Sequence, residues 1–299
     1  MKFREVLQKS AYGTIGYIAG PDDLQVLERN IVHNLPLLRA FTNVIVATNY
    51  GGESPHELAA GNKEVWRRYF PDCAILDSGC NRGHSIGTSD LDNLVFDHCK
   101  ASDIEWLCKG ANDVLLSAPV FDIEIRAADF YYLNAISCSA MQQQDFDCAR
   151  IKAHLFYPQT TFYALNVSKT DFLIDKEFLD RSYAIVNRIP DYNGRIWEHI
   201  PRWSCELLLR KCVLRNRLTR CHLMDDAQFS RLLSVVQERC IEDCSHKNLT
   251  INGICHFHGP ELLDWEPRVT LREGLAPTVE AERQRTRRAE EPGAAAEPF

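Results

Sequence analysis

Asn112 and Asp113 are the residues of this sequence best placed to hold a charged ligand. They follow the apolar segment 106–108, which we predict to be a strand. In open α/β sheets, ligands bind at the carboxyl ends of the strands, where a carboxylate can hold a divalent cation against phosphate oxygens. Lys109 lies between this strand and the polar pair and would add positive charge. The structural alternative is that Asp113 caps the element that follows.

A glycine-containing loop over residues 77–87 offers a second place for an anion. It leaves one predicted strand and enters a predicted helix, so its backbone N–H groups and the helix N-terminus could face a diphosphate. Arg82 would add charge there. The glycine spacing matches neither the dinucleotide fingerprint nor the phosphate-binding loop. An ordinary strand-to-helix connection is therefore the alternative.

Glu206 and two late histidines complete the set of candidate reactive side chains. Glu206 lies near the start of a predicted helix and is followed by three leucines, a setting in which a carboxylate can act as a general base. The alternative is a solvated helix glutamate. His256 and His258 leave a short predicted strand on the same face, because side chains alternate along a strand. Either histidine can ligate a metal or serve the structure alone.

The cysteines allow a rival interpretation. Cys240, Cys244 and Cys255, together with His258, could form a structural zinc site, although their spacing is looser than in known pairs. The chain has 12 cysteines spread along its length, whereas a disulfide scaffold usually crowds them. We therefore expect most of them to be reduced and buried as small apolar side chains.

Alternating strands and helices must position these residues. Up to about residue 120, the predicted strands cover 13–20, 43–48, 73–76 and 106–108, and the predicted helices cover 22–38, 57–69 and 90–99. This alternation predicts an α/β fold with a mostly parallel sheet flanked by helices. Beyond residue 120 the rhythm changes. The predicted strands there cover 130–133, 160–167 and 251–256, and the predicted helices cover 176–186, 203–214 and 226–240.

Composition limits the class of protein. The chain has 299 residues, is 45% hydrophobic and 25% charged, and carries a net charge of −7. An acidic balance argues against a general nucleic-acid binder, which needs a net basic face. No apolar run approaches the roughly 18–20 residues of a membrane helix, and no segment is typical of a secretory signal. We therefore expect a cytoplasmic protein with neither a membrane span nor a nucleic-acid partner.

Taken in order over residues 13–258, these pieces resemble the GT-A glycosyltransferases of the family 2 type, which use nucleotide-sugar donors. The segment Asn81-Arg82-Gly83 is similar to the Asn-x-Gly loop after the third strand, and Asp113 is similar to the last acid of the DxD motif. Glu206 is placed like the helix acid that is often the catalytic base. His256 or His258 is placed like the late histidine that often completes the metal shell.

The resemblance implies a GT-A-like, Rossmann-like sheet, a helical C-terminal part and three regions. Residues 1–120 would form the nucleotide-sugar-binding half, and residues 121–265 would bind the acceptor and carry catalysis. Residues 266–299 are rich in Glu, Arg, Ala and Pro, and we predict a disordered tail there.

The activity implied is transfer of a sugar from a nucleoside diphosphate sugar to the hydroxyl of a glycan or another acceptor. Asp113 with a late histidine would hold Mn²⁺ or Mg²⁺ against the diphosphate, aided by Lys109 or Arg82. Glu206 would deprotonate the acceptor, and direct displacement would invert the anomeric centre. Asn49 and Asp77, at strand ends, are candidates to contact the base or the ribose.

Two other function classes stay open. Ala111 occupies the first position of the DxD motif, so one carboxylate remains there, and Leu207 follows Glu206 where the family often has a second acid. These departures favour a protein that keeps the GT-A fold and binds a nucleotide or a glycan without turnover. A nucleotidyltransferase is a further alternative, but residues 13–23 lack the Lys or Arg of its usual glycine-rich signature.

Overall fold

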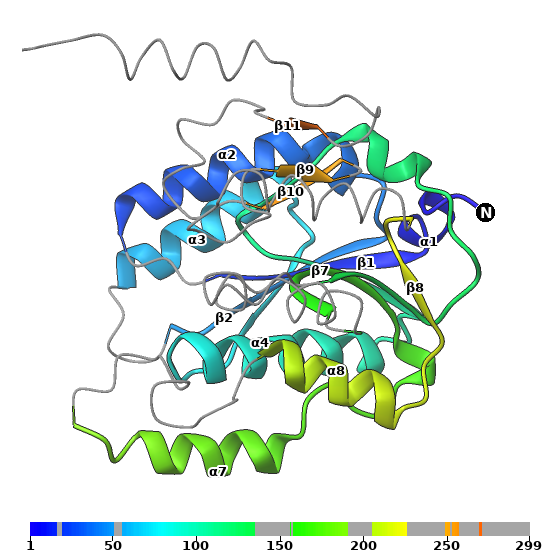
Figure 1. Cartoon of the computed structure of the whole chain (residues 1–299). Helices are drawn as coiled ribbons and strands as arrows, with labels where there is room; N and C mark the ends of the chain where they lie inside the picture. Colours follow the sequence, from blue (N-terminus) through cyan, green and yellow to red (C-terminus); the bar gives the residue numbers. More distant parts are fainter. Residues whose placement is uncertain are drawn as a thin grey trace, which may run out of the picture.

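Two sheets and the helices around them make up the described part of the chain, which comprises residues 1–16, 20–50, 56–134, 156, 158–190, 205–225, 249–251, 253–256 and 269–270 of a computed structural model (Figure 1). The strands are β1 (Ser10–Ile15), β2 (Asn43–Thr48), β3 (Ala74–Asp77), β4 (Trp106–Gly110), β5 (Val114–Leu116), β6 (Phe130–Asn134), β7 (Pro158–Asn166), β8 (Arg220–His222), β9 (Leu249–Ile251), β10 (Ile254–His256) and β11 (Val269–Thr270). The helices are α1 (Arg4–Leu7), α2 (Pro21–Leu38), α3 (His56–Tyr69), α4 (His84–Ala101), α7 (Lys176–Val186) and α8 (Cys205–Arg215). Short 3₁₀ segments cover Ala118–Asp122 and Val167–Lys169.

The main sheet has seven strands in the order β3-β2-β1-β4-β7-β6-β8. The first four of these strands run parallel. β7 runs antiparallel to both of its neighbours, and β8 runs parallel to β6. The predicted α/β fold is confirmed: the sheet is mostly parallel, Rossmann-like and flanked by helices. The pairing of β4 with β7 places the two predicted halves, 1–120 and 121–265, in one sheet.

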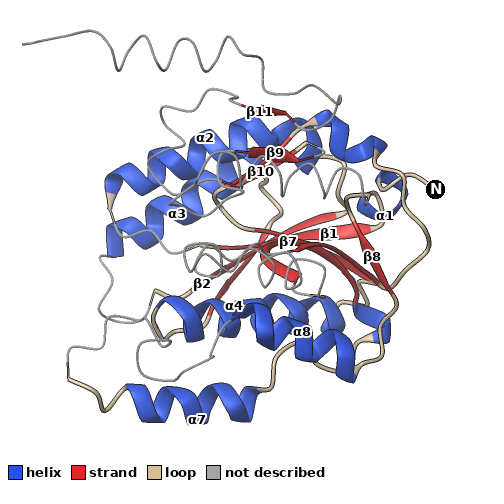
Figure 2. Ribbon diagram, in the orientation of Figure 1, coloured by secondary structure: helices blue, strands red, loops and turns tan. Residues whose placement is uncertain are grey.

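Helices cover both faces of this sheet (Figure 2). α2 and α3 pack on one face, α4 and α8 pack on the other, and α7 packs against α4 on its side away from the sheet. The apolar spacing of α2 explains its orientation, because Leu27, Ile31 and Leu38 are all buried against the sheet. Full burial of such a side chain contributes about 1.5–3 kcal/mol. Both faces of the parallel strands are therefore covered, which leaves the strand ends as the accessible parts.

A second sheet, in the order β11-β9-β10-β5, brings the late strands beside the end of β4. α2 holds β5 in place, because the side-chain amides of Asn30 and Asn34 both donate to the carbonyl oxygen of Val114. On the other side, the backbone N–H of Ser117 donates to the carbonyl of Gly253 over 2.7 Å. β10 then runs antiparallel to β5. Ser117 and Gly253 are 136 positions apart in the sequence.

Most predicted boundaries lie within a few residues of the observed ones, and those of β2 and α7 coincide with them. Three predictions were wrong in extent. β1 begins at Ser10 instead of residue 13, because Ser10 and Ala11 are already buried between the neighbouring strands. α4 begins at His84 instead of residue 90, since Gly83 (φ 80°) supplies the N-cap. The predicted strand 251–256 is divided into β9 and β10 by a turn at Gly253 (φ 83°).

The structure also bears on the predictions for the late helix, the tail, the cysteines and a membrane span. The predicted helix 226–240 lies outside the described residues, as do Cys240 and Cys244 of the zinc alternative. Within the predicted tail 266–299, the structure describes only β11, which pairs with β9. The seven cysteines whose side chains are described, namely Cys73, Cys80, Cys99, Cys108, Cys205, Cys212 and Cys221, are free. Among the described residues, no helix combines the length and apolar character needed to cross a membrane.

Candidate active site at the carboxyl edge of the sheet

The carboxyl ends of β1, β2, β3 and β4 lie at one edge of the main sheet, since these strands are parallel neighbours. Asn112, just after β4, lies close to Gly16, just after β1: a Cβ built on Gly16 would be 3.6 Å from Nδ2 of Asn112. Both residues line a recess with Thr14, Asn62 and Trp66. The structure therefore brings Asn112 to the place where a ligand of this fold class binds.

The loop between β3 and α4 is held by asparagine side chains. Oδ1 of Asn81 accepts the backbone N–H of Gly83 over 2.9 Å and the side-chain amide of Asn49 over 3.1 Å. The positive φ of Gly83, 80°, is a conformation that favours glycine. Asn49 is only 4% exposed, and its Oδ1 has no hydrogen-bond partner among the described residues. The predicted set Asn49, Asn81 and Gly83 thus forms one contact group.

Asp77 lies at the exposed end of β3 and closes a turn within this loop. Its Oδ1 accepts the backbone N–H of Gly79 over 2.9 Å, and Gly79 has a φ of 69°. The side chain is exposed at the sheet edge. Asp77 therefore combines a local structural contact with the edge position that was predicted for it.

Arg82 is held by carboxylates of two helices. Its Nη1 lies 2.6 Å from Oδ1 of Asp180 on α7 and 3.7 Å from Oδ1 of Asp90 on α4. The guanidinium also lies over the ring of Tyr183, 5.2 Å from its centroid. Burial raises the pKa of Asp90, and the charge of Arg82 opposes that rise. The structure thus places Arg82 at the predicted loop, but turns it toward α7.

Asp113 lies in the short turn between β4 and β5 and is half-buried. Its carboxylate is close to Tyr12: burial is the main cause of the raised pKa of Tyr12, with Cys108 and then Asp113 adding to it. β10 pairs with β5 so that His256 is opposite Val114, the residue that follows Asp113. The structure therefore brings the backbone of His256 beside Asp113. The side chain of His256 and all of His258 lie outside the described residues.

Glu206 reaches the same edge from α8. Oγ1 of Thr160 donates to Oε1 of Glu206 over 3.3 Å. The next residue, Thr161, accepts the backbone N–H of Ala111 at its carbonyl oxygen over 2.8 Å. The start of β7 thus connects Glu206 to the turn that carries Asp113. The acid and base candidates predicted from distant parts of the sequence lie at one edge of one sheet.

Lys109 is placed differently from the expectation. Its side chain is 3% exposed, and Nζ lies 3.5 Å from Oδ1 of Asp92 on α4. Nζ also donates to the carbonyl oxygen of Thr160. Side chains alternate along β4, so Lys109 faces α4, whereas Cys108 and Gly110 face the cluster on the other side of the sheet, and both sides are covered. Its ammonium is paired in the core, so we do not propose Lys109 as a contact of the diphosphate.

Asn62 is a site residue that the sequence reasoning missed. It is 1% exposed, its Nδ2 donates to the hydroxyl of Tyr50 over 2.6 Å, and its Oδ1 has no hydrogen-bond partner among the described residues. The sequence pattern that could have identified Asn62 is its position on the apolar face of a predicted helix, at helical spacing from Leu58, Val65 and Trp66. A buried amide at such a position costs free energy unless a partner satisfies it.

The donors at this edge suit a divalent cation that also binds phosphate. A carboxylate and an imidazole, completed by phosphate oxygens, are ligands that Mn²⁺ accepts, and Mg²⁺ accepts the oxygen donors. Of such a set, the structure describes the Asp113 carboxylate and the backbone of His256, which is opposite Val114. Among the side chains that the structure describes, no three of the His, Cys, Asp and Glu residues form a metal-binding cluster. The described residues of the zinc alternative are limited to the backbone of Cys255.

Comparison with known proteins gives similarity in structure alone. No model of a protein family matches the sequence, and no curated protein matches it. A similar solved structure is the galactosyltransferase LgtC in complex with donor and acceptor sugar analogs, with 9% identity, 84% of this chain and 87% of that chain covered, and a TM-score of 0.40. A second is the mannosyltransferase PcManGT from Pyrobaculum calidifontis in complex with GDP-Man and Mn²⁺, with 13% identity, 79% and 64% covered, and a TM-score of 0.37. A third is the nucleoside-diphosphate-sugar pyrophosphorylase from Vibrio cholerae RC9, with 10% identity, 71% and 90% covered, and a TM-score of 0.39. The neighbours are GT-A-like sugar-nucleotide enzymes, but similarity this low assigns no reaction to this chain.

Proposed function

We propose that this protein transfers a sugar from a nucleoside diphosphate sugar to an acceptor hydroxyl. One observation supports it most directly: Asp113, the backbone of His256 and Glu206 come from three distant segments and lie at the carboxyl edge of the sheet. A carboxylate and a histidine beside a general-base candidate, next to a recess, are the parts that such a displacement needs.

The nucleoside would bind over the carboxyl ends of the parallel strands, beside the small recess that Asn62 and Asn112 line. Oδ1 of Asn62 and Oδ1 of Asn49 are buried acceptors without partners among the described residues. They can therefore accept N–H groups of a base or hydroxyl groups of a ribose, and ligand binding would satisfy both. Asn112 lines the same recess, while Asn81 and Gly83 shape the loop that would lie against the diphosphate. Arg82 and the exposed Asp77 would contribute at its rim.

Asp113 and His256 would hold a Mn²⁺ or Mg²⁺ ion, with His258 as the other candidate for the histidine ligand. Bound there, the cation would neutralise the charge that develops on the departing diphosphate. Asp113 is the single acid retained from the DxD pattern, since Ala111 occupies the first position. The protein's own contribution is to keep this carboxylate half-buried in a short turn fixed by β4 and β5.

Glu206 would take the proton of the acceptor hydroxyl as its oxygen attacks the anomeric carbon. The bond to the diphosphate oxygen breaks on the opposite side, so the anomeric centre inverts, and the proton ends on the Glu206 carboxylate. The hydroxyl of Thr160 orients that carboxylate at the sheet edge. The acceptor, a glycan or another hydroxyl compound, would be bound by the second half of the chain, residues 121–265. We propose a cytoplasmic location for this reaction.

A second candidate is binding of a nucleotide or a glycan without turnover. Ala111 favours it, because the turn that carries Asp113 lacks the other carboxylate of the motif. This candidate keeps the recess and the asparagine acceptors and gives no chemical role to Glu206. The two functions therefore differ in what a bound sugar nucleotide becomes.

A combined binding and hydrolysis assay separates them. The protein is heated with UDP-glucose, UDP-galactose, UDP-N-acetylglucosamine or GDP-mannose, each with Mn²⁺, Mg²⁺ or EDTA, and release of the nucleoside diphosphate is followed. A donor at a hundredfold excess over Kd adds about 2.7 kcal/mol of stability. Metal-dependent stabilisation with slow hydrolysis supports the transferase. Stabilisation without hydrolysis supports the binding protein, and no stabilisation by any donor contradicts both.

Matched variants then test the roles. Glu206→Gln should lower the hydrolysis rate by about 10²–10⁴-fold, the usual contribution of a general base, while thermal stabilisation by the donor persists. Asp113→Asn should abolish the metal dependence of donor binding. Asp72→Asn removes an exposed carboxylate just before β3, at the opposite ends of the parallel strands, and serves as the control. Full activity of both site variants would overturn the assignment.

A further inference from the structure

One ion pair of the described residues has both partners in the core. Lys109 on β4 and Asp92 on α4 lie 3.5 Å apart, and each side chain is 3% exposed. The other ion pairs within the described part each include at least one side chain that is more than a fifth exposed. The Lys109–Asp92 pair is therefore the one for which the cost of removing charge from water is greatest.

Stability alone explains this pair poorly. Replacing a buried ion pair by apolar side chains of similar volume is often neutral or stabilising, because desolvation of two charges offsets their attraction. The pairing is also incomplete: Oδ1 of Asp92 has no hydrogen bond among the described residues, and burial raises the pKa of Asp92 while Lys109 opposes the rise. The position on a central strand would otherwise suit an apolar residue.

The contacts of the pair lead to Glu206. Nζ of Lys109 donates to the backbone carbonyl of Thr160, and Oγ1 of Thr160 donates to Oε1 of Glu206 over 3.3 Å. Thr160 is 8% exposed, so this hydroxyl has little competition from water. Within the described residues, it gives the one hydrogen bond that reaches the Glu206 carboxylate. Lys109 thus holds the backbone of the residue that orients the candidate base.

The neighbouring residue on α8 does not compete for this role. Cys205 is hydrogen-bonded by Oγ of Ser89 over 3.5 Å. Burial raises the pKa of Cys205 to about 12, and the nearby charge of Glu206 adds to the rise. The thiol is therefore protonated at neutral pH and is a poor nucleophile. The reactive group at the start of α8 is Glu206.

We propose that Lys109 and Asp92 are positioning residues for Glu206 and act on it through Thr160. This inference rests on the proposed function, in which Glu206 is the base. The pair would anchor the first residues of β7 at the carboxyl edge, so that the Thr160 hydroxyl keeps the Glu206 carboxylate in one orientation beside the acceptor. A small misplacement of such a group can lower a rate by about a hundredfold.

Thr160→Val is the main test, because valine keeps the shape of threonine and removes only the hydroxyl donor. With a sugar nucleotide that is hydrolysed in the assay above, kcat should fall at least about tenfold, while KM for the donor stays within about threefold. The melting temperature should change little. Thr160→Ser restores the hydroxyl and should recover most of kcat, which a purely structural role would not predict.

Thr170→Val is the matched control. Thr170 is also a buried threonine, and its Oγ1 donates to the carbonyl oxygen of Asn166 over 2.7 Å at the opposite edge of the sheet. The control should lower the melting temperature without lowering kcat. Wild-type kcat in Thr160→Val would overturn the inference, as would an equal loss of kcat in both valine variants.

The double variant Lys109→Met/Asp92→Leu tests the pair itself. It removes both charges together, so the fold should persist, whereas kcat should fall toward the level of Thr160→Val. Unchanged kcat in a folded double variant would overturn the role of the pair. If Glu206→Gln keeps full activity, the assignment of the base fails first, and the inference falls with it. If Glu206→Gln is inactive while the Thr160 and Lys109 variants are active, only the inference fails.

Discussion

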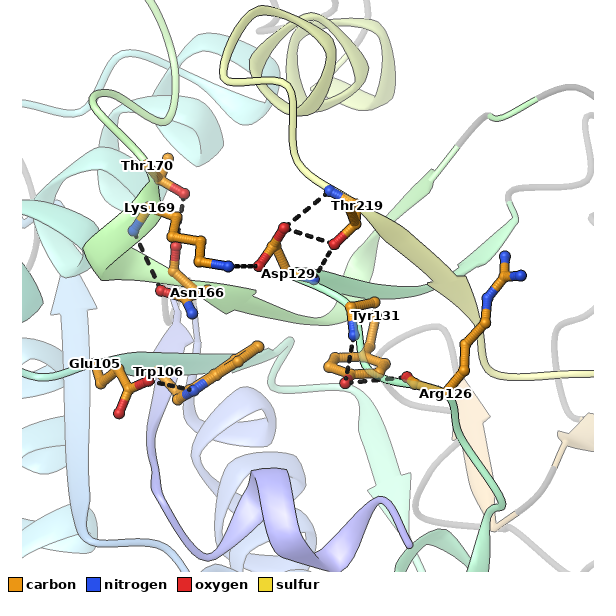
Figure 3. A network of polar contacts seen from close by, with 10 residues as sticks. Glu105, Trp106, Arg126, Asp129, Tyr131, Asn166, Lys169, Thr170 and Thr219 are labelled. Carbon is orange, nitrogen blue, oxygen red and sulfur yellow. Dashed lines mark hydrogen bonds and ion pairs between the residues drawn. The ribbon is translucent and has the colours of Figure 1, made fainter. Parts of the chain in front are cut away.

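Two buried carboxylates at opposite edges of the main sheet are treated differently by the fold. Asp129 precedes β6 at the edge where β4 begins. Its carboxylate accepts hydrogen bonds from Lys169 Nζ over 2.7 Å, from the backbone N–H of Thr219 over 3.0 Å and from the Thr219 hydroxyl over 2.5 Å (Figure 3). Asp92, near the opposite edge, has Lys109 as its ion-pair partner among the described residues, at 3.5 Å, and also lies close to Tyr163. One carboxylate is fully hydrogen-bonded, and the other is not.

Their pKa values move in opposite directions for this reason. Burial raises the pKa of Asp129, but hydrogen bonds from Lys169 and Thr219 lower it further, so it lies below its ordinary value. For Asp92, burial dominates, and the pKa is raised. The Asp129 network joins β6, β7 and β8 and serves stability. Toward the carboxyl edge, Asp92 and the asparagines Asn49 and Asn62 have side-chain oxygens without hydrogen-bond partners among the described residues.

The largest effect is expected for removal of one partner of the undersatisfied pair. Lys109→Met leaves the Asp92 carboxylate buried without a counter-charge, which should lower the free energy of unfolding by about 3–5 kcal/mol. Urea unfolding at neutral pH measures this loss. Adding Asp92→Leu should restore most of the stability, because no buried charge is then left. A double variant as unstable as the single one would contradict the comparison.

Asp129→Asn should give the next largest loss. Hydrogen bonds to charged groups contribute about 1.5–3 kcal/mol, and the amide keeps the size of the side chain while losing its charge. The variant should therefore be destabilised by about that amount at pH 7, with no change in hydrolysis of the sugar nucleotide. Urea unfolding and the hydrolysis assay together check both parts.

The pH dependence of this loss identifies its cause. The folded pKa of Asp129 lies below its unfolded value of about 3.9, so its stabilisation is complete above that value and disappears as pH falls through the folded pKa. The difference in unfolding free energy between wild type and Asp129→Asn should therefore narrow below about pH 4. A constant difference down to pH 2 would show that the charge of Asp129 is not what stabilises this edge.

Gly253→Ala should have a smaller effect, confined to the late strands. Gly253 has a φ of 83°, and a Cβ there would lie 2.7 Å from the backbone nitrogen of Val120. A left-handed conformation costs a residue with a side chain about 1–2 kcal/mol. β10 should detach from β5, so metal-dependent donor binding should weaken more than global stability. Equal donor affinity in the variant and the wild type would exclude His256 from the site.

The sequence predicted many single strands and helices well because their signals are local. The strand Asn43–Thr48 is an unbroken apolar run, and Lys176–Val186 has both a helical period and Asp175 as its N-cap, whose side chain accepts the N–H of Phe178. Element boundaries were wrong where glycine conformation decides them, as at Gly83 and Gly253. Such a positive φ depends on the packing around the turn.

Candidate residues were predicted by type, and their surroundings were not. Asn49, Asn81 and Gly83 follow neighbouring strands, so parallel order alone placed them together. Lys109 was predicted to aid in binding the diphosphate, but it pairs with Asp92, whose place on α4 follows from how that helix packs on the sheet. The pairing of β10 with β5 joins distant segments, and no local pattern in the sequence encodes that register.

The smallest effect is expected for an exposed ion pair at the edge that Asp129 serves. Arg4 and Asp122 lie 2.8 Å apart, but their side chains are 49% and 46% exposed. Exposed pairs contribute about 0–1 kcal/mol, because water and salt screen them. Asp122→Asn should therefore change the unfolding free energy by less than about 1 kcal/mol, and added salt should remove even that difference. Urea unfolding at low and at high salt, beside Asp129→Asn, checks it. A loss equal to that of Asp129→Asn would mean that charge alone, and not burial with three hydrogen bonds, sets the contribution of a carboxylate at this edge.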